Sequence, residues 1–363
     1  MQINLNSMDK SKNAYKVYSN MWSDDSRIPG KICNTYYPKY EQDSNNSYSF
    51  EIPDLSSKYL TTAKELSKEE KEAIADQLIL NFKIDYEEKD DFKGKLISAC
   101  SGSGGEGAKI TTLHSSSLCA FLFFYKVSDT KPLNIDINGN NVAFFKVLFE
   151  YQNTVIEGRN PSNVDIVLIG KDNKNKDIIL FLESKFSEYL TAKQANVALE
   201  YIKQYPNIYN PKDPTFLDAI GFEFKKNKKD GSFIHQIERE GKIENFYNIG
   251  PKQGSVYSEG IKQMISHYLG IKNYLEKENK RHDKRPLPKA EIYLAEIIFD
   301  FAFGKAKKCL EKYTNAYKAL AKELNKLNKG INVLEKPLLY SLFREKDFIN
   351  PTIRKFYFGE EKQ

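Results

Sequence analysis

Two carboxylates and a lysine lie within apolar runs in the middle of the chain, where charges are costly unless they are paired. Asp165 lies in the run 164–170, and Glu183 and Lys185 lie near the end of the run 178–186. Carboxylates that share a divalent cation, with a lysine nearby, are mutually satisfied in such a place. This group suits hydrolysis of a phosphodiester: the cation would polarise the phosphate and activate a water, and the lysine would orient that water or neutralise developing charge.

The two apolar runs predict a β-hairpin that brings these side chains together. The first run is rich in β-branched residues, the second is rich in bulky apolar residues, and the segment 171–177 between them is polar. Side chains alternate along a strand, so Glu183 and Lys185 point to one face while Ser184 points to the other. Asp165, Glu183 and the carbonyl of Ser184 are therefore the predicted metal ligands, and an oxygen-only set favours Mg²⁺ or Mn²⁺ over zinc.

The spacing Glu-x-Lys carries little information by itself in a lysine-rich chain. Copies at 69–71, 87–89, 240–242, 278–280 and 360–362, for example, do not follow a run of apolar residues as 183–185 does. The competing interpretation is an exposed edge hairpin on which Glu183 and Lys185 form a surface ion pair. The aspartate within the preceding apolar strand favours the site over the surface pair.

Asp165, the hairpin and Glu183-Ser184-Lys185 together resemble the PD-(D/E)xK nuclease superfamily. Val164 stands where that pattern usually has proline, at a position where the superfamily is variable. Further segments resemble a bacterial family classed as restriction endonucleases, and they extend the resemblance over about residues 98–305. These segments are 101–106, 114–117, 161–165, 183–190 and 260–267.

The resemblance implies an α/β fold with a restriction-endonuclease-like core, in which helices flank a mixed central β-sheet and helical elaborations lie at both ends. It implies a metal-dependent endonuclease that hydrolyses DNA phosphodiester bonds, of the type II restriction kind, with Lys185 as electrostatic catalyst. Double-stranded DNA would be the substrate, and a cognate methyltransferase would be encoded separately. Because one chain has one metal centre, cutting both strands predicts a homodimer.

Two alternatives stay open beside this interpretation. A catalytically inactive DNA-binding protein of the same fold would bind DNA in a salt-sensitive way without cleaving it. A repair, resolvase-type or RNA-directed nuclease would keep the chemistry but act on other substrates. The complete ligand set favours a catalyst over an inactive relative.

Two glutamates are candidates for a further catalytic acid. Glu150 ends the predicted strand 142–151 and could reach the metal from beside Asp165, although a solvent contact at the strand end is the simpler interpretation. Glu106 lies in the glycine-rich segment 102–107, before the first core helix. That segment also satisfies GxGxxG, but no buried parallel strand precedes it, so a dinucleotide site is not favoured.

Other polar residues are candidates for accessory or DNA-contacting roles. Gln263 and His267 are four residues apart and share one face of the predicted helix 258–275. Similar nucleases place a glutamine-bearing helix beside the active site, while simple packing of these two residues on a helix flank is the alternative. Gln194 follows the catalytic strand and could contact a phosphate.

Composition and length bound the remaining possibilities. With 40% hydrophobic and 13% aromatic residues the chain can build a large core, and a net charge of +6 permits a polyanionic partner without demanding one. Four scattered cysteines without CxxC spacing argue against structural zinc and fit reduced thiols. The N-terminus shows no signal-peptide pattern, and the longest apolar stretch, 118–125, is too short to cross a bilayer. We expect a cytoplasmic protein with no membrane association.

The chain is predicted to consist of an N-terminal peripheral segment, 1–95, and a nuclease domain, 96–350, with an insertion at about 206–256. The predicted core elements are a helix at 115–127, strands at 142–151, 164–170 and 178–186, helices at 191–205 and 258–275, a strand at 292–301 and a helix at 305–327.

Overall fold

The structure is a computed structural model that describes residues 68–100 and 115–358, except 229, 240–241, 277–282, 284, 302–303, 328–329, 345 and 347. The segment 1–60 and the glycine-rich segment with Glu106 lie outside the described residues.

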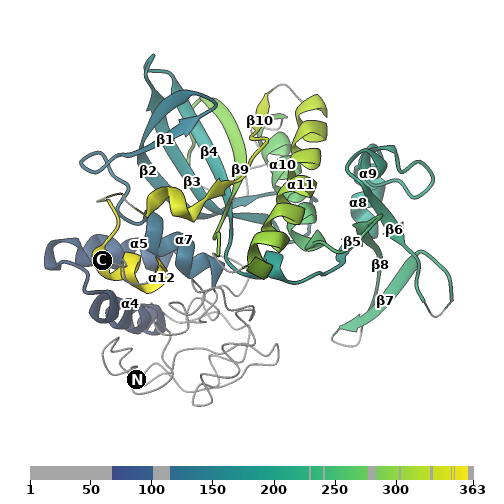
Figure 1. Cartoon of the computed structure of the whole chain (residues 1–363), viewed down its shortest axis with the longest axis horizontal. Coiled ribbons are helices and arrows are strands. Elements are labelled where there is room, and N and C mark those ends of the chain that lie inside the picture. The colour runs from purple at the N-terminus through teal and green to yellow at the C-terminus, as the bar shows by residue number, and fades with distance from the viewer. Residues whose placement is uncertain are drawn as a thin grey trace.

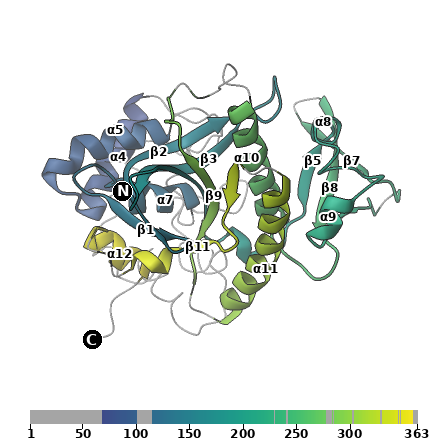
Figure 2. The same cartoon turned by 90° about the horizontal axis from the view of Figure 1, so that it is seen from above.

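A mixed β-sheet forms the centre of the described chain and curls around one helix (Figures 1 and 2). The strand order is β1-β2-β3-β4-β9-β10, with β11 also paired to β9. Strands β1 to β4 pair with one another in antiparallel fashion, whereas β9 pairs in parallel with β4, β10 and β11. The strands are β1 Leu133–Ile137, β2 Asn140–Asn153, β3 Ser162–Asp172, β4 Asp177–Lys185, β9 Glu291–Ile298, β10 Ile331–Val333 and β11 Leu338–Leu339.

The predicted hairpin is confirmed as β3 and β4, which pair from Lys171 opposite Asp177 to Ile166 opposite Leu182. Strand β4 is buried except at its first residue, and β3 is buried over its apolar stretch 166–170, as continuous apolar runs require for a sheet covered on both faces. The alternative of an exposed edge hairpin is wrong, because β4 lies between β3 and β9.

Helices cover both faces of this sheet (Figure 2). Helix α7, Ser116–Phe124, lies inside the curl, and the Ser115 hydroxyl caps it by accepting a hydrogen bond from the Leu118 amide, as the serine run predicts. Helices α10, Ser258–Glu276, and α11, Gly304–Leu327, lie outside the curl. The remaining helices that pack around the sheet are α4 Lys68–Phe82, α5 Lys89–Ala99 and α12 Pro351–Phe358.

Helix α10 faces the sheet because its apolar residues recur every three or four positions. Ile261, Met264, Ile265 and Tyr268 are all fully buried. Other positions of α10, beside this apolar face, can therefore carry polar side chains.

A second, smaller sheet corrects two predictions about the middle of the chain. The predicted helix 191–205 contains a strand before its helical part, and the segment predicted as an insertion at about 206–256 contains strands of a sheet of its own. The order in this sheet is β5-β8-β6, with β7 also paired to β8, and it stands apart from the main sheet on the far side of α10 and α11 (Figure 1). Its elements are β5 Ala195–Ala198, α8 Leu199–Gln204, α9 Thr215–Ala219, β6 Phe222–Lys225, β7 Ile234–Arg239 and β8 Lys242–Pro251.

The architecture is therefore mixed α/β, with a central mixed sheet and flanking helices, as predicted at this level. The C-terminal elaboration differs from the prediction, because it is not purely helical. After α11 the chain returns to the main sheet and adds β10 and β11 alongside β9. No helix in the described ranges combines the length and apolarity that a membrane span needs.

Candidate functional site

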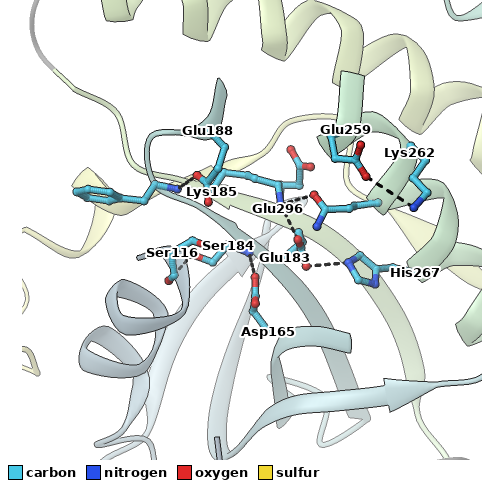
Figure 3. Close-up of polar contacts among 12 residues, drawn as sticks. Ser116, Asp165, Glu183, Ser184, Lys185, Glu188, Glu259, Lys262, His267 and Glu296 are labelled. Atoms are coloured by element: carbon cyan, nitrogen blue, oxygen red, sulfur yellow. Dashed lines mark hydrogen bonds and ion pairs between the residues drawn. The ribbon is translucent and has the colours of Figure 1, made fainter. Parts of the chain in front are cut away.

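Glu183 and Lys185 form a buried ion pair on the face of β4 that α10 covers (Figure 3). The Lys185 ammonium donates to Oε1 of Glu183 over 2.5 Å, and each side chain is no more than 4% exposed. Ser184 points to the opposite face, where its hydroxyl lies 2.8 Å from that of Tyr340 and donates to the Ser116 carbonyl at the start of α7. The predicted alternation of the three residues is confirmed.

Helix α10 holds both members of this pair from one face. Gln263 Oε1 accepts a hydrogen bond from Lys185 over 2.9 Å, and one turn later His267 Nε2 lies 2.7 Å from the second oxygen of Glu183. Because a carboxylate only accepts, Nε2 is the protonated ring nitrogen, and Nδ1 is left to meet the Ser162 hydroxyl at 2.6 Å. Gln263 and His267 thus contact Lys185 and Glu183 directly, and their accessory or DNA-contacting role stays a prediction.

Asp165 lies beside Glu183 at the point where the β3–β4 ladder ends. Its Oδ2 accepts a hydrogen bond from the Ser184 amide over 2.7 Å, in place of the backbone partner that a continued ladder would provide. The N–H and C=O of one residue point to the same side of a strand, so the Ser184 carbonyl also points toward the strand of Asp165.

Glu150 comes to this point from β2 through a distorted backbone. Its φ is +50°, in the left-handed region that is uncommon for residues other than glycine, and it lies between the pairs Phe149–Ile166 and Tyr151–Val164. Strain of this kind costs about 1–3 kcal/mol and persists only where the surroundings enforce it. Glu150 is buried, so the interpretation as a solvent contact at a strand end is wrong.

Arg285 is the residue that holds this distortion. Its guanidinium donates to the carbonyls of Phe149 and Glu150, over 2.8 and 3.0 Å, and is itself paired with Asp283. Asp283 also accepts a hydrogen bond from the Gln152 amide, so the bend in β2 is fixed on both sides.

Glu296 adds another carboxylate to the same face, from β9. It is directly opposite Glu183 in the parallel β4–β9 register and is completely buried. The Tyr313 hydroxyl of α11 donates to its Oε1 over 2.8 Å, while its Oε2 has no hydrogen-bond partner among the described residues.

The environment sets the ionisation of these groups in opposite directions. Burial disfavours the Glu183 carboxylate, but Lys185 and His267 more than offset it and lower the pKa of Glu183 to about 2. Burial likewise opposes the Lys185 ammonium, yet Glu183 holds its pKa well above the usual value. The pKa of Asp165 is raised well above its usual value by desolvation and by the nearby charges of Glu183 and Glu150.

The donor set fits a hard divalent cation, although it is small. Among the described residues no three His, Cys, Asp or Glu side chains are arranged to hold a metal ion. The predicted oxygen donors at this point are two carboxylates, Asp165 and Glu183, and the Ser184 carbonyl. Mg²⁺ commonly takes only one or two protein carboxylates. Desolvation first, and then the charges of Glu183 and Glu150, raise the pKa of Asp165, and a bound cation would favour its ionised form.

The predicted site residues thus fall into three groups. The first group consists of the predicted residues that the structure brings together around the Glu183–Lys185 pair: Glu150, Asp165, Glu183, Ser184, Lys185, Gln263 and His267. Gln194 is instead exposed, ahead of β5 and against the position of Gly250. Glu106 lies outside the described residues.

Three residues of the site were not predicted: Ser162, Glu296 and Tyr313. Glu296 carried the same signal as Asp165, a single carboxylate within an apolar strand, and that signal could have identified it. Ser162 and Tyr313 carry no comparable signal, since a serine before a strand and a tyrosine in a helix are ordinary.

Comparison with known proteins adds no name to this arrangement. The chain matches no protein-family model, no curated protein and no solved structure.

Proposed function

We propose that this protein is a divalent-metal-dependent endonuclease of the PD-(D/E)xK kind that hydrolyses DNA phosphodiester bonds. The observation that carries the proposal is the convergence of the half-buried Asp165 with the buried Glu183 and Lys185 at one point of the main sheet. Bringing such charged groups together away from water is costly, and clusters of this kind are enriched at functional sites.

The arrangement of the elements supports the same proposal. Along the chain the site is framed by α7, then the antiparallel strands β2, β3 and β4, then α10, and then β9 parallel to β4. This order of helix, three strands, helix and strand is the one that the resemblance to PD-(D/E)xK nucleases implies. The small sheet is inserted between β4 and α10.

In the proposed reaction the chain's own residues have distinct roles. Asp165, Glu183 and the Ser184 carbonyl would hold Mg²⁺ or Mn²⁺, which when bound supplies Lewis-acid polarisation of the scissile phosphate. Lys185 would neutralise the charge that develops on the phosphate oxygens. Gln263 would keep the Lys185 ammonium directed into the site, and the Ser162–His267 pair would fix the rotamer of Glu183.

Plasmid cleavage with purified protein tests the proposal. Glu183→Gln and Lys185→Ala are each expected to abolish cleavage in Mg²⁺ or Mn²⁺, because the first weakens the cation site and the second removes the electrostatic catalyst. The matched controls are Glu223→Gln and Lys225→Ala, which alter the same Glu-x-Lys spacing in β6 and should cleave like the wild type. Sequencing the ends would define the cleavage pattern.

The alternatives give different results in the same experiment. Full activity of the Glu183 or Lys185 variant would overturn the assignment. Salt-sensitive DNA binding with no cleavage in any divalent cation would favour the inactive DNA-binding protein. Cleavage of only branched or damaged DNA would favour a repair or resolvase-type nuclease.

A further inference from the structure

Glu296 has one satisfied and one unsatisfied carboxylate oxygen at the centre of the protein. Its side chain has no solvent exposure, Tyr313 donates to Oε1, and Oε2 has no partner among the described residues. A buried polar atom without a partner costs about 1–3 kcal/mol, so a strand that keeps one calls for an explanation.

The structure fixes Glu296 in this half-satisfied state. Tyr313 reaches the carboxylate by passing close to α10 at Gly260, where a Cβ atom would lie 2.1 Å from the Tyr313 hydroxyl oxygen. Only glycine leaves room for this approach. Tyr313 therefore anchors Oε1 from one side, and Oε2 remains available to another group.

The group best placed to use that oxygen is the Lys185 ammonium. Glu296 is paired in register with Glu183, so its side chain shares the face of the sheet that carries Glu183 and Lys185. Figure 3 shows the end of the Lys185 side chain between Glu183 on one side and Glu296 on the other. In the present arrangement Lys185 donates to Glu183 and Gln263.

We propose that Glu296 is the alternative partner of Lys185, which the ammonium takes up when Glu183 turns its oxygen toward a divalent cation. This inference rests on the proposed function, because it assumes that Glu183 is a cation ligand. A carboxylate oxygen shared with a cation gives a buried ammonium much less compensation, and an unpaired buried ammonium is costly. With Gln263 as a neutral partner, and with Glu296 giving up its proton as the ammonium approaches, Lys185 stays charged and directed into the site. Glu296 is thus a positioning residue.

The first test follows Lys185 directly, without DNA. In protein labelled with ¹⁵N-lysine, the protected Lys185 ammonium should give a resonance that is assigned by its loss in Lys185→Met. Addition of Mg²⁺ should shift this resonance in the wild type and leave it visible. In Glu296→Gln the same addition should abolish it, because the ammonium then has no carboxylate partner and exchanges with water.

Two further variants separate partner loss from disturbed packing. Tyr313→Phe keeps the Glu296 carboxylate and should retain the resonance in Mg²⁺. Glu296→Asp keeps a carboxylate, but its side chain is shorter by one methylene and no longer reaches Lys185. It should lose the Lys185 resonance in Mg²⁺, as Glu296→Gln does. A wild-type response to Mg²⁺ in Glu296→Gln or in Glu296→Asp would overturn the inference while leaving the proposed function standing.

Cleavage kinetics give a second readout. Glu296→Gln should lower kcat by about 10- to 100-fold with little change in KM or in the Mg²⁺ concentration for half-maximal rate, as expected for a residue that orients a catalytic group. Unchanged kcat would overturn the inference. Absence of any Mg²⁺ response in the wild-type resonance would overturn the proposed function itself, and this inference with it.

Discussion

Two Glu-x-Lys pairs lie on β-strands in the described part of the chain, and their surroundings differ strongly. In β4 of the main sheet, Lys185 donates to Glu183 over 2.5 Å, and the side chains are 3% and 4% exposed. In β6 of the small sheet, Lys225 donates to Glu223 over 2.7 Å, but the side chains are 23% and 45% exposed. Spacing and strand geometry are the same in both pairs.

The surroundings make the difference. Among the described strands β6 pairs with β8 alone, and Lys225 also donates to the Pro251 carbonyl, so this pair is satisfied locally. Strand β4 lies inside its sheet, where Asp165 and Glu296 come to the same face from the two neighbouring strands. A Glu-x-Lys pair therefore becomes a candidate site through burial beside other carboxylates, and the short motif alone does not make one.

Removing the lysine from each pair should show the largest contrast in stability. Lys185→Met keeps the apolar stem but leaves Glu183 buried with only His267, and breaking a buried ion pair in this way costs about 3–5 kcal/mol. Lys225→Met breaks a solvent-screened pair and should cost about 1 kcal/mol or less. Urea unfolding of both variants measures the difference, and equal losses would contradict the comparison.

Glycine replacements compare the backbones of the two sheets. In β3, a Cβ at Gly170 would lie 2.3 Å from the Ala143 carbonyl oxygen and 2.8 Å from the Phe144 Cα, next to a bulge in β2. Backbone cannot move aside cheaply, so Gly170→Ala should lower the free energy of unfolding by about 3 kcal/mol.

The matched position in the small sheet is Gly250 of β8. There the nearest atom to a new Cβ would be the Cε of Lys225, 3.0 Å away on a flexible side chain. Gly250→Ala should therefore change stability by no more than about 0.5 kcal/mol. Thermal unfolding of the two variants measures both changes in stability. A loss of stability in Gly250→Ala as large as that in Gly170→Ala would show that the small sheet is packed as tightly as the main one.

The pH dependence of stability should carry a smaller signature of the buried carboxylates. Burial raises the pKa of Glu296 from 4.5 to about 8, so between these values the folded protein keeps a proton that the unfolded chain releases. Stability of the wild type is therefore lost as the pH rises through this window. Glu296→Gln cannot ionise and should match the wild type at about pH 4 but exceed it at about pH 9, by about 1.4 kcal/mol for each unit of the pKa shift.

Glu223→Gln is the control for this experiment, because it changes an exposed glutamate in the small sheet. It should differ from the wild type by no more than about 0.5 kcal/mol at either pH. A stability gain for Glu296→Gln that is the same at both pH values would contradict the assignment of the effect to ionisation. A gain at high pH together with lower cleavage would mark Glu296 as a residue kept for function at the expense of stability.

Much of the central architecture could be predicted from local pattern. The runs around Asp165 and Glu183 predicted the hairpin because β-branched and apolar residues on both faces require a buried strand. The three- and four-residue spacing of apolar positions predicted α10, and the serine run predicted the start of α7. The alternation of side chains then placed Glu183 and Lys185 on one face and Ser184 on the other.

Other features depended on contacts between distant segments, and no local pattern carries them. The segment 195–198 has an apolar content that suits a helix, but it pairs with 246–249 and becomes β5. Glu150 adopts its left-handed backbone because Arg285, far along the chain, holds the bend in β2.

By itself the sequence determined which residues could do chemistry, because charges within apolar runs are costly wherever the chain places them. It also determined the strands and helices that carry Asp165, Glu183, Lys185 and His267. Only the tertiary structure decided which charges meet. The parallel pairing of β4 with β9 sets Glu296 beside Glu183, and this register is decided by packing of whole elements and not by the residues of either strand alone.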